Sequence, residues 1–297
     1  MAKQPRSLAG KVAVVTGGGR GIGKSLSEAL AREGVRVAIG DLDVESAERT
    51  AAELGGGALG LRLDVTDLPG YTAFLDEVEQ RLGPIDILVN NAGIMPITPL
   101  EEESMASITR QLEINLRAVI HGTQEAMRRM RPCGTGHIVN IASLAGKAGY
   151  PNLATYAATK HAVVGLSEAV RFELKGSGVE VSCVMPGIVD TELSSGMQEA
   201  RGVKNLTPEE VAGEVIGALE VPRFDVFVPR STGPLLKFAS MLPRRAREAM
   251  AHVMRADQVA VTVDQSKRAA YESRVAASGP TAERVAEVQL DRERDAA

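Results

Sequence analysis

Short apolar runs alternate along the chain with longer segments of helical periodicity, and this alternation limits the possible folds more than any other feature. Seven runs have the β-branched, continuously apolar character of strands that are buried on both faces. They span residues 11–17, 36–41, 58–65, 85–93, 137–143, 179–187 and 224–229. The helical patterns between them cover about 21–33, 44–54, 71–82, 104–131 and 154–176. This order predicts a parallel sheet joined by right-handed crossovers.

One α/β domain with an extension accounts for all 297 residues. We predict a doubly wound, Rossmann-type, seven-stranded parallel sheet with helices on both faces. The expected parts are an N-terminal arm over 1–9, the sheet domain over 10–232, a helical C-terminal extension over 233–277 and a flexible tail over 278–297. The tail is inferred from its polar, Ala-rich sequence.

Charge and composition exclude several classes of protein. The formal net charge of -4 argues against a nucleic-acid partner held by bulk positive charge. No apolar run approaches the ~18 residues of a transmembrane helix, and the run "VAVV" is too short for a signal peptide, so a cytoplasmic protein is the default expectation. The two cysteines and four histidines show no metal-ligand spacing, so we expect no metal site.

The stretch TGGGRGIGKS (16–25) fits two kinds of nucleotide-binding turn. Residues Gly18 to Ser25 match the P-loop pattern GxxxxGKS, whereas the pattern GxxxGxG from Gly17 suits a dinucleotide. In both turns, glycines without a Cβ let backbone N–H groups approach a phosphate at the N-terminus of a helix. The stretch alone therefore leaves both interpretations open.

Residues further along the chain favour the dinucleotide. Ser143 follows a predicted strand, Tyr156 comes thirteen residues later, and Lys160 four residues after that. Tyr156 and Lys160 therefore share one face of a helix, and Ser143 lies at the carboxyl end of a strand, where such sheets bind ligands. Asp41 ends the second strand, 18 residues after Gly23, where a dinucleotide fold places the acid that binds the adenosine ribose.

In combination these motifs resemble the main branch of the short-chain dehydrogenase/reductase family, with its TGxxxGxG and YxxxK patterns, over roughly residues 8 to 230. The resemblance implies a nicotinamide dinucleotide cofactor and a catalytic tetrad of Asn115, Ser143, Tyr156 and Lys160. Cofactor contacts are expected from the glycine turn, the strand ends, the catalytic helix and the loop after the sixth strand: Gly17, Arg20, Gly21, Ile22, Gly23, Asp41, Asp64, Val65, Asn91, Ala92, Gly93, Tyr156, Lys160, Pro186, Gly187, Val189 and Thr191.

The chemistry implied is hydride transfer between a carbinol carbon and the nicotinamide, which leaves one proton to be moved. Tyr156 is expected to take this proton from the alcohol or return it to the alkoxide. An unperturbed tyrosine titrates near ~10, and we expect Lys160, with the positive oxidised nicotinamide, to lower the pKa of Tyr156. Ser143 is expected to donate a hydrogen bond to the substrate oxygen, and Asn115 to hold a water that relays the proton.

Two charged residues, Asp41 and Arg20, favour different cofactors, NAD and NADP. Asp41 is expected to bind both ribose hydroxyls and to repel a 2′-phosphate at ~6 Å by about 3 kcal/mol. Arg20, in the glycine turn, is placed to pair with that phosphate, but an exposed arginine gains little because water screens it. The sequence therefore predicts NAD, with NADP the less favoured cofactor.

The expected substrate pocket is mostly apolar, with Met95, Leu144, Ala145, Leu153, Ile188, Leu193 and Met197 in its wall. Such a lining favours a small hydrophobic secondary alcohol or ketone. The family usually pairs its subunits through the helices over 104–131 and 154–176, which implies a homodimer or homotetramer. The apolar and basic segment 234–254 is expected to pack over the pocket, to pack on a partner subunit, or to contact a membrane surface.

Two other functions stay open. A P-loop nucleotide hydrolase would use Gly18 to Ser25 but gives no role to Ser143, Tyr156 or Lys160. A catalytically inactive dinucleotide-binding scaffold is expected to lack the tyrosine or the lysine. The favoured prediction is an NAD-dependent oxidoreductase, in which Lys24 and Ser25 are ordinary residues of an exposed first helical turn.

Overall fold

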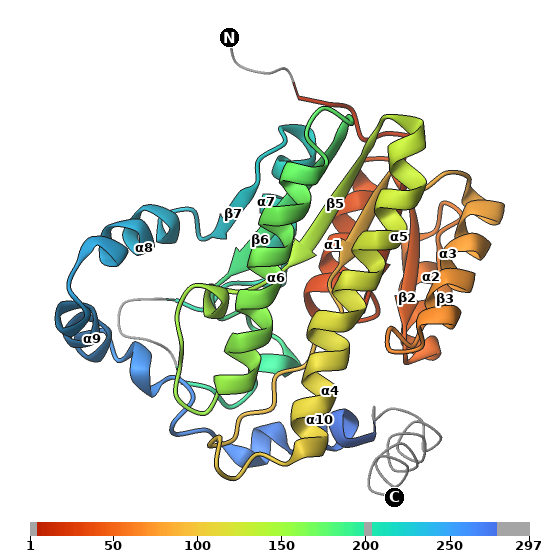
Figure 1. The fold of residues 1–297 in the computed structure, drawn as a ribbon. Helices are drawn as coiled ribbons and strands as arrows, with labels where there is room; N and C mark the ends of the chain where they lie inside the picture. The colour runs from red at the N-terminus through yellow and green to blue at the C-terminus, as the bar shows by residue number, and fades with distance from the viewer. Residues whose placement is uncertain (1–4, 199–203, 278–297) are drawn as a thin grey trace, which may run out of the picture.

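The computed structural model describes residues 5–198 and 204–277. Within them, seven parallel strands form one sheet in the order β3-β2-β1-β4-β5-β6-β7 (Figure 1). The strands are β1 Val12–Thr16, β2 Arg36–Asp41, β3 Leu59–Arg62, β4 Ile87–Asn90, β5 Gly136–Ile141, β6 Val179–Pro186 and β7 Asp225–Val228. The predicted doubly wound seven-stranded fold is confirmed. The flexible tail predicted for 278–297 lies outside the described residues.

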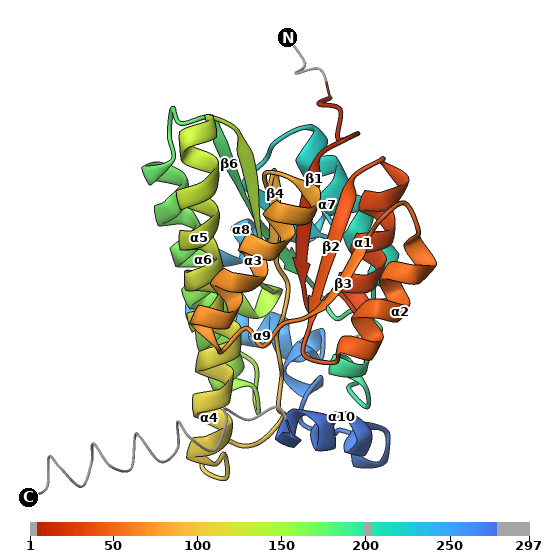
Figure 2. The same cartoon turned by 90° about the vertical axis from the view of Figure 1, so that its right-hand side faces the viewer.

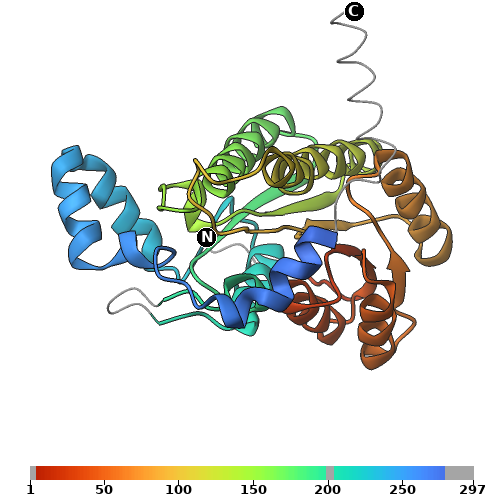
Figure 3. The same cartoon turned by 90° about the horizontal axis from the view of Figure 1, so that it is seen from below.

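Helices cover both faces of the sheet, as Figures 2 and 3 show from the side and from below. Helices α1, α2 and α7 lie on one face, and α3, α5 and α6 lie on the other. Their bounds, with α4, are α1 Gly21–Arg32, α2 Val44–Leu54, α3 Leu68–Leu82, α4 Met105–Leu112, α5 Ala118–Cys133, α6 Ala154–Glu173 and α7 Pro208–Glu220.

Strand β1 shows why the strands are apolar without alternation. Ala13 and Val15 belong to the core beneath α1 and α7, whereas Val12 and Val14 belong to the core beneath α3 and α5. All four residues are fully buried, because successive side chains of a strand point to opposite faces and here both faces are covered. Both faces of the sheet are therefore packed against helices.

One predicted helix contains an irregular turn. The sequence indicated a single helix over 104–131, but the structure inserts a π-helical turn, Glu113–Arg117, between α4 and α5. Helical periodicity does not predict such a turn. The other predicted strands and helices agree with the structure to within a few residues at their ends, and α3 begins earlier, at Leu68. Helix α7 was not among the predicted helices.

The C-terminal extension consists of helices α8 Thr232–Met241, α9 Arg244–Val253 and α10 Gln265–Ala277, with a short 3₁₀ turn after α9. Helices α8 and α9 project to one side of the sheet domain, whereas α10 lies below the carboxyl ends of the strands (Figures 1 and 3). Tyr271 and Val275 of α10 belong to the same buried cluster as Ile94. Among the described residues, none of the helices is both long and apolar enough to cross a membrane.

Candidate active site

A cavity of about 1720 Å³ opens at the carboxyl ends of the strands. Most of the predicted site residues line it: Gly17, Arg20, Gly21, Ile22, Asp41, Asp64, Val65, Met95, Asn91, Ala92, Gly93, Ser143, Leu144, Ala145, Leu153, Tyr156, Lys160, Pro186, Gly187, Ile188, Val189, Thr191, Leu193 and Met197. Gly23 and Asn115 are not part of its wall. The predicted site residues of three parts of the chain, 17–65, 91–95 and 143–197, are thus brought to one place.

The turn after β1 is fastened to the end of β4 by hydrogen bonds. Thr16 Oγ1 accepts from the backbone N–H groups of Asn91 (3.0 Å) and Ala92 (3.1 Å), and Asn91 Nδ2 donates to the carbonyls of Thr16 (2.9 Å) and Gly17 (3.0 Å). A Cβ on Gly23 would lie 2.2 Å from the Gly17 carbonyl oxygen, so only glycine lets α1 start this close to the turn. The result is bare backbone at a helix N-terminus, a cradle that fits a pyrophosphate.

Lys24 and Ser25, the residues that a P-loop would direct at phosphate, are engaged elsewhere. Lys24 Nζ donates to Glu53 (2.6 Å), and Ser25 Oγ donates to Glu209 (3.0 Å). Neither residue lines the cavity. The expectation that both lie in an exposed turn was wrong for Ser25, which is 6% exposed because α7 packs against α1 at this point.

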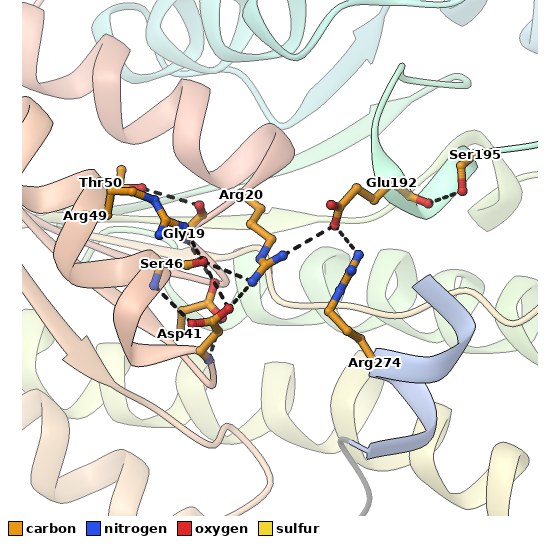
Figure 4. Close-up of polar contacts among 10 residues, drawn as sticks. Gly19, Arg20, Asp41, Ser46, Arg49, Thr50, Glu192, Ser195 and Arg274 are labelled. Carbon is orange, nitrogen blue, oxygen red and sulfur yellow. Dashed lines mark hydrogen bonds and ion pairs between the residues drawn. The ribbon is translucent and has the colours of Figure 1, made fainter. Parts of the chain in front are cut away.

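Asp41 and Arg20 stand at the end of the cavity near β2. The two carboxylate oxygens of Asp41 accept hydrogen bonds from the backbone N–H groups of Gly19 (3.0 Å) and Asp43 (3.1 Å). Burial raises the pKa of Asp41, and these two hydrogen bonds act against that rise. Arg20 forms an ion pair with Asp43 and lies 3.8 Å from Glu192 (Figure 4). Its positive charge is therefore shared between two carboxylates of the protein.

The predicted catalytic side chains meet at the other end. Tyr156 and Lys160 lie on α6. Ser143 lies in the loop directly after β5 and shares a side-chain hydrogen bond with Tyr156. Lys160 Nζ donates to the carbonyl of Ile141 (2.8 Å) and lies 5.7 Å from the centre of the Tyr156 ring. A hydroxyl, a phenol and an amine thus face one apolar space.

Burial controls the titration of this group. It raises the pKa of Tyr156 to about 12, against the lowering effect of the Ser143 hydrogen bond. It also lowers the pKa of Lys160 to about 8. The sequence led us to expect that Lys160 lowers the pKa of Tyr156. In the structure desolvation dominates instead, because Tyr156 is 7% and Lys160 4% exposed and the Lys160 amine is bonded to a backbone carbonyl.

Asn115 is fully buried behind the cavity. Its Oδ1 accepts from the backbone N–H of Ile94 (2.8 Å), and its Nδ2 donates to the Ile94 carbonyl (2.8 Å) and to Thr159 Oγ1 (3.4 Å). The amide therefore fixes the segment after β4, as a buried asparagine can when it satisfies backbone groups. The water relay implied for Asn115 stays a prediction.

One of the placements expected for segment 234–254 was over the pocket, and residues of this segment line the cavity, among them Leu236, Ala239 and Met250. The sequence did not predict that the chain after residue 254 also forms part of this site. The apolar cluster of Met95, Ala145 and Leu153 also contains Val259 and Ala260. Three residues of α10 line the cavity as well: Tyr271, Arg274 and Val275. The one available signal was their helical spacing, since Tyr271 and Val275 are four residues apart on one buried face. No catalytic motif marks them.

The part of the chain that the structure describes holds no group of three or more His, Cys, Asp or Glu residues arranged for a metal ion. The site instead combines a backbone cradle, a carboxylate at the end of the second strand, and a tyrosine with a nearby lysine. These residues fit a dinucleotide that lies along the strand ends with its pyrophosphate at α1.

Comparison with known proteins agrees with this geometry. A family model described as short chain dehydrogenase matches residues 11–202. The chain belongs to this family, and it is an oxidoreductase of the kind that acts on hydroxyl groups with a nicotinamide dinucleotide. The match ends before α7, so the extension lies beyond it.

Individual relatives differ in the substrates that their names give. The chain is 41% identical over 191 residues to a sorbitol dehydrogenase of Cereibacter sphaeroides, covering 64% of this chain and 75% of that protein. It is 39% identical over 192 residues to a 3-alpha-(or 20-beta)-hydroxysteroid dehydrogenase of Mycobacterium bovis, covering 65% and 74%. A short chain dehydrogenase/reductase from Burkholderia phymatum, solved in complex with NAD, has a TM-score of 0.74 at 27% identity, covering 80% and 95%.

Proposed function

We propose that the protein interconverts a hydrophobic secondary alcohol and its ketone, with NAD as cofactor and Tyr156 as the general acid and base. The observation that carries this proposal is the meeting of Ser143, Tyr156 and Lys160 in the cavity that also holds the glycine turn. A bound nicotinamide supplies the hydride acceptor or donor. The protein's own residues then have to bind the substrate oxygen and move one proton.

Each polar residue has a separate role in that step. The Tyr156 phenol gives its proton to the alkoxide in ketone reduction, and the phenolate takes it back in alcohol oxidation. Ser143, which already bonds to Tyr156, donates a hydrogen bond to the substrate oxygen as charge develops there. Lys160 is fixed by Ile141, with its amine on the cavity wall, and binds the nicotinamide ribose. Asn115 supports this end of the site through the Ile94 backbone.

The preference for NAD is supported by the charges around the ribose end. Asp41 lines the cavity, and Arg20 is already paired with Asp43 and close to Glu192, so little positive charge is left for a 2′-phosphate. The relative solved with NAD agrees with this choice. Comparison of kcat/KM for NAD and NADP tests it, and a clear preference for NADP would show that Arg20 prevails.

The substrate class is supported by the apolar pocket. Met95, Leu153, Leu193 and Met197 surround the space beside Tyr156. The hydroxysteroid dehydrogenase relative acts on a substrate of this kind, whereas the sorbitol dehydrogenase relative acts on a polyol. A panel from short alcohols through sugar alcohols to steroids, followed at the NADH absorbance band, tests the proposal. We expect turnover with the bulky apolar alcohols, and turnover with polyols alone would overturn the substrate class.

Assays of nucleotide hydrolysis and of NADH binding separate the two other functions. Magnesium-dependent ATP or GTP hydrolysis without NADH binding would support the P-loop hydrolase, and NADH binding without turnover of any alcohol would support an inactive scaffold. Against the hydrolase, Lys24 and Ser25 bond to Glu53 and Glu209 rather than facing the cavity.

Two further expectations concern assembly and location. A homodimer or homotetramer through α4, α5 and α6 is supported by the exposed apolar side chains of Met105 on α4 and Phe172 on α6, and light scattering tests it. Peripheral membrane contact through 234–254 is supported by exposed Phe238 and Met241 beside the arginines of α9. Flotation with anionic liposomes, with and without this segment, tests the second expectation.

A further inference from the structure

Arg268 of α10 is an arginine whose side chain is completely buried. Its guanidinium donates to the carbonyls of Met95 (2.5 Å), Leu193 (2.9 Å) and Ser195 (3.2 Å) and forms an ion pair with Glu272 (2.8 Å). Burying a charge is costly unless hydrogen bonds and an opposite charge compensate it. Here the Arg268 side chain donates hydrogen bonds to three carbonyls on two separate segments. The position of its guanidinium therefore depends on those segments as much as on α10.

The two segments lie on either side of the substrate pocket. Met95 follows β4, and residues 193–195 belong to the loop after β6. Neither segment belongs to the sheet, so their backbone groups need partners from elsewhere. The Tyr271 hydroxyl accepts a hydrogen bond from the N–H of Met95 (2.8 Å), and Arg268 donates one to the carbonyl of Met95. Helix α10 thus supplies partners for both backbone groups of Met95.

Further contacts tie the extension to the loop after β6 and to the segment before α6. The N–H of Asp264 donates to the Gly196 carbonyl (3.0 Å), and Asn152 Nδ2 donates to the carbonyl of Ala260 (2.9 Å). Arg274 of α10, which lines the cavity, pairs with Glu192 at the start of the loop after β6 (Figure 4). The buried contacts come from Arg268 and Tyr271, while the Arg274 pair is exposed and therefore weak.

We propose that Arg268 is a positioning residue of the active site, which holds the segments at Met95 and Leu193 at a fixed separation and so sets the width of the substrate pocket. This inference rests on the proposed function, because the pocket is taken to bind the alcohol or ketone. Both segments contribute side chains to the cavity wall, and Tyr271 lies directly under the guanidinium, 4.8 Å from it. The width of the pocket is thus controlled by a residue beyond the family match, which ends at 202.

This arrangement separates substrate affinity from chemistry. Arg268 makes no contact with Ser143, Tyr156 or Lys160 in the hydrogen bonds of the described residues. Loss of its three carbonyl contacts therefore widens or loosens the pocket without removing the acid and base. The effect is expected in KM for the alcohol or ketone rather than in kcat.

The test compares Arg268→Met, Arg268→Lys and a matched control, Lys267→Met, which removes an exposed charge from the neighbouring position. Arg268→Met leaves buried carbonyls without partners, so we expect KM for the best substrate to rise about tenfold or more. Arg268→Lys keeps a charged donor, so its KM is expected to lie between those of Arg268→Met and the wild type. Lys267→Met is expected to match the wild type. An unchanged KM in folded Arg268→Met would overturn the proposal.

A second readout does not depend on turnover. Amide hydrogen exchange in peptides covering 93–97 and 191–196 is expected to accelerate in both peptides for Arg268→Met and in neither for Lys267→Met. If Arg268→Met does not fold, Tyr271→Phe removes only the hydroxyl that accepts from Met95 and is expected to accelerate exchange in the first peptide. If the wild type oxidises none of the alcohols, the proposed function fails, yet the exchange pattern still decides the role of Arg268. Unchanged exchange in both peptides of Arg268→Met would overturn that role.

Discussion

The two walls of the cavity are held together by different kinds of contact. The wall formed by the turn after β1 depends on backbone atoms in close approach: Gly17 has φ +62°, Gly23 leaves no space for a Cβ, and Asn91 ties the turn to β4. The wall formed by the extension depends on long side chains, above all Arg268 and Tyr271, which reach backbone groups far away in sequence.

This difference teaches which part of the site is free to vary. A wall of close backbone contacts admits few side chains, so its shape and its ligand are fixed together. A wall held by long side chains can change its spacing through a few substitutions without disturbing the sheet. We infer that the first wall determines which cofactor binds and that the second determines which substrate fits beside it.

The largest expected effect comes from Tyr156→Phe. Tyr156 lies between the two walls, so this variant tests whether both walls serve one reaction. Loss of the phenol removes the proton donor and acceptor, so kcat is expected to fall about 10³-fold or more. NADH affinity, measured by fluorescence titration, is expected to stay nearly unchanged, since the ring and its packing remain. Tyr150→Phe is the matched control, because Tyr150 also lines the cavity. This variant is expected to lose little of its kcat. A Tyr156→Phe protein that keeps most of its rate would contradict the assignment.

Ser143→Ala is expected to have the next largest effect. Removing a donor to the developing oxyanion lowers kcat by about 10²-fold. The Ser143 hydrogen bond also lowers the Tyr156 pKa, so its loss raises that pKa. Because the phenolate is the form that acts in alcohol oxidation, the pH profile of kcat/KM at saturating NAD is expected to shift to higher pH. A profile that stays in place while the rate falls would show that Ser143 acts on the substrate alone.

The sequence predicted the sheet and the first wall because their determinants are local. Strand runs, the glycine turn and the spacing from Tyr156 to Lys160 can each be recognised within a short stretch. The second wall depends on contacts such as that between Arg268 and Met95, which are 173 residues apart and leave no motif. The burial of Ser25 was missed for a related reason, since it follows from the packing of α7 against α1.

Asp41→Ser tests the charge on the first wall. A carboxylate that repels the 2′-phosphate costs about a hundredfold in NADP affinity relative to NAD, so its removal is expected to shift the ratio of kcat/KM values toward NADP by up to about that factor. Glu48→Gln removes an equal charge from the exposed side of α2, away from the cavity, and is expected to leave the ratio unchanged. Equal shifts in both variants would indicate a general charge effect instead of a contact at the ribose.

The smallest expected effect concerns the packing of the first wall. In Gly23→Ala the new Cβ would lie 2.2 Å from the Gly17 carbonyl oxygen, so the turn must move away from α1. Overpacking of this kind costs about 1–3 kcal/mol, and we expect NADH affinity to fall by about tenfold while the overall fold persists. Isothermal titration with NADH measures the loss.

Gly213→Ala makes the same change where there is space. Gly213 lies on the exposed side of α7, and a Cβ there meets no atom within 4 Å. Alanine also favours the helix by up to about 1 kcal/mol, so this variant is expected to unfold at the same or a slightly higher temperature and to bind NADH normally. If Gly23→Ala binds NADH as tightly as Gly213→Ala does, then the turn adapts to an added side chain, and the contrast between a fixed and an adjustable wall is lost.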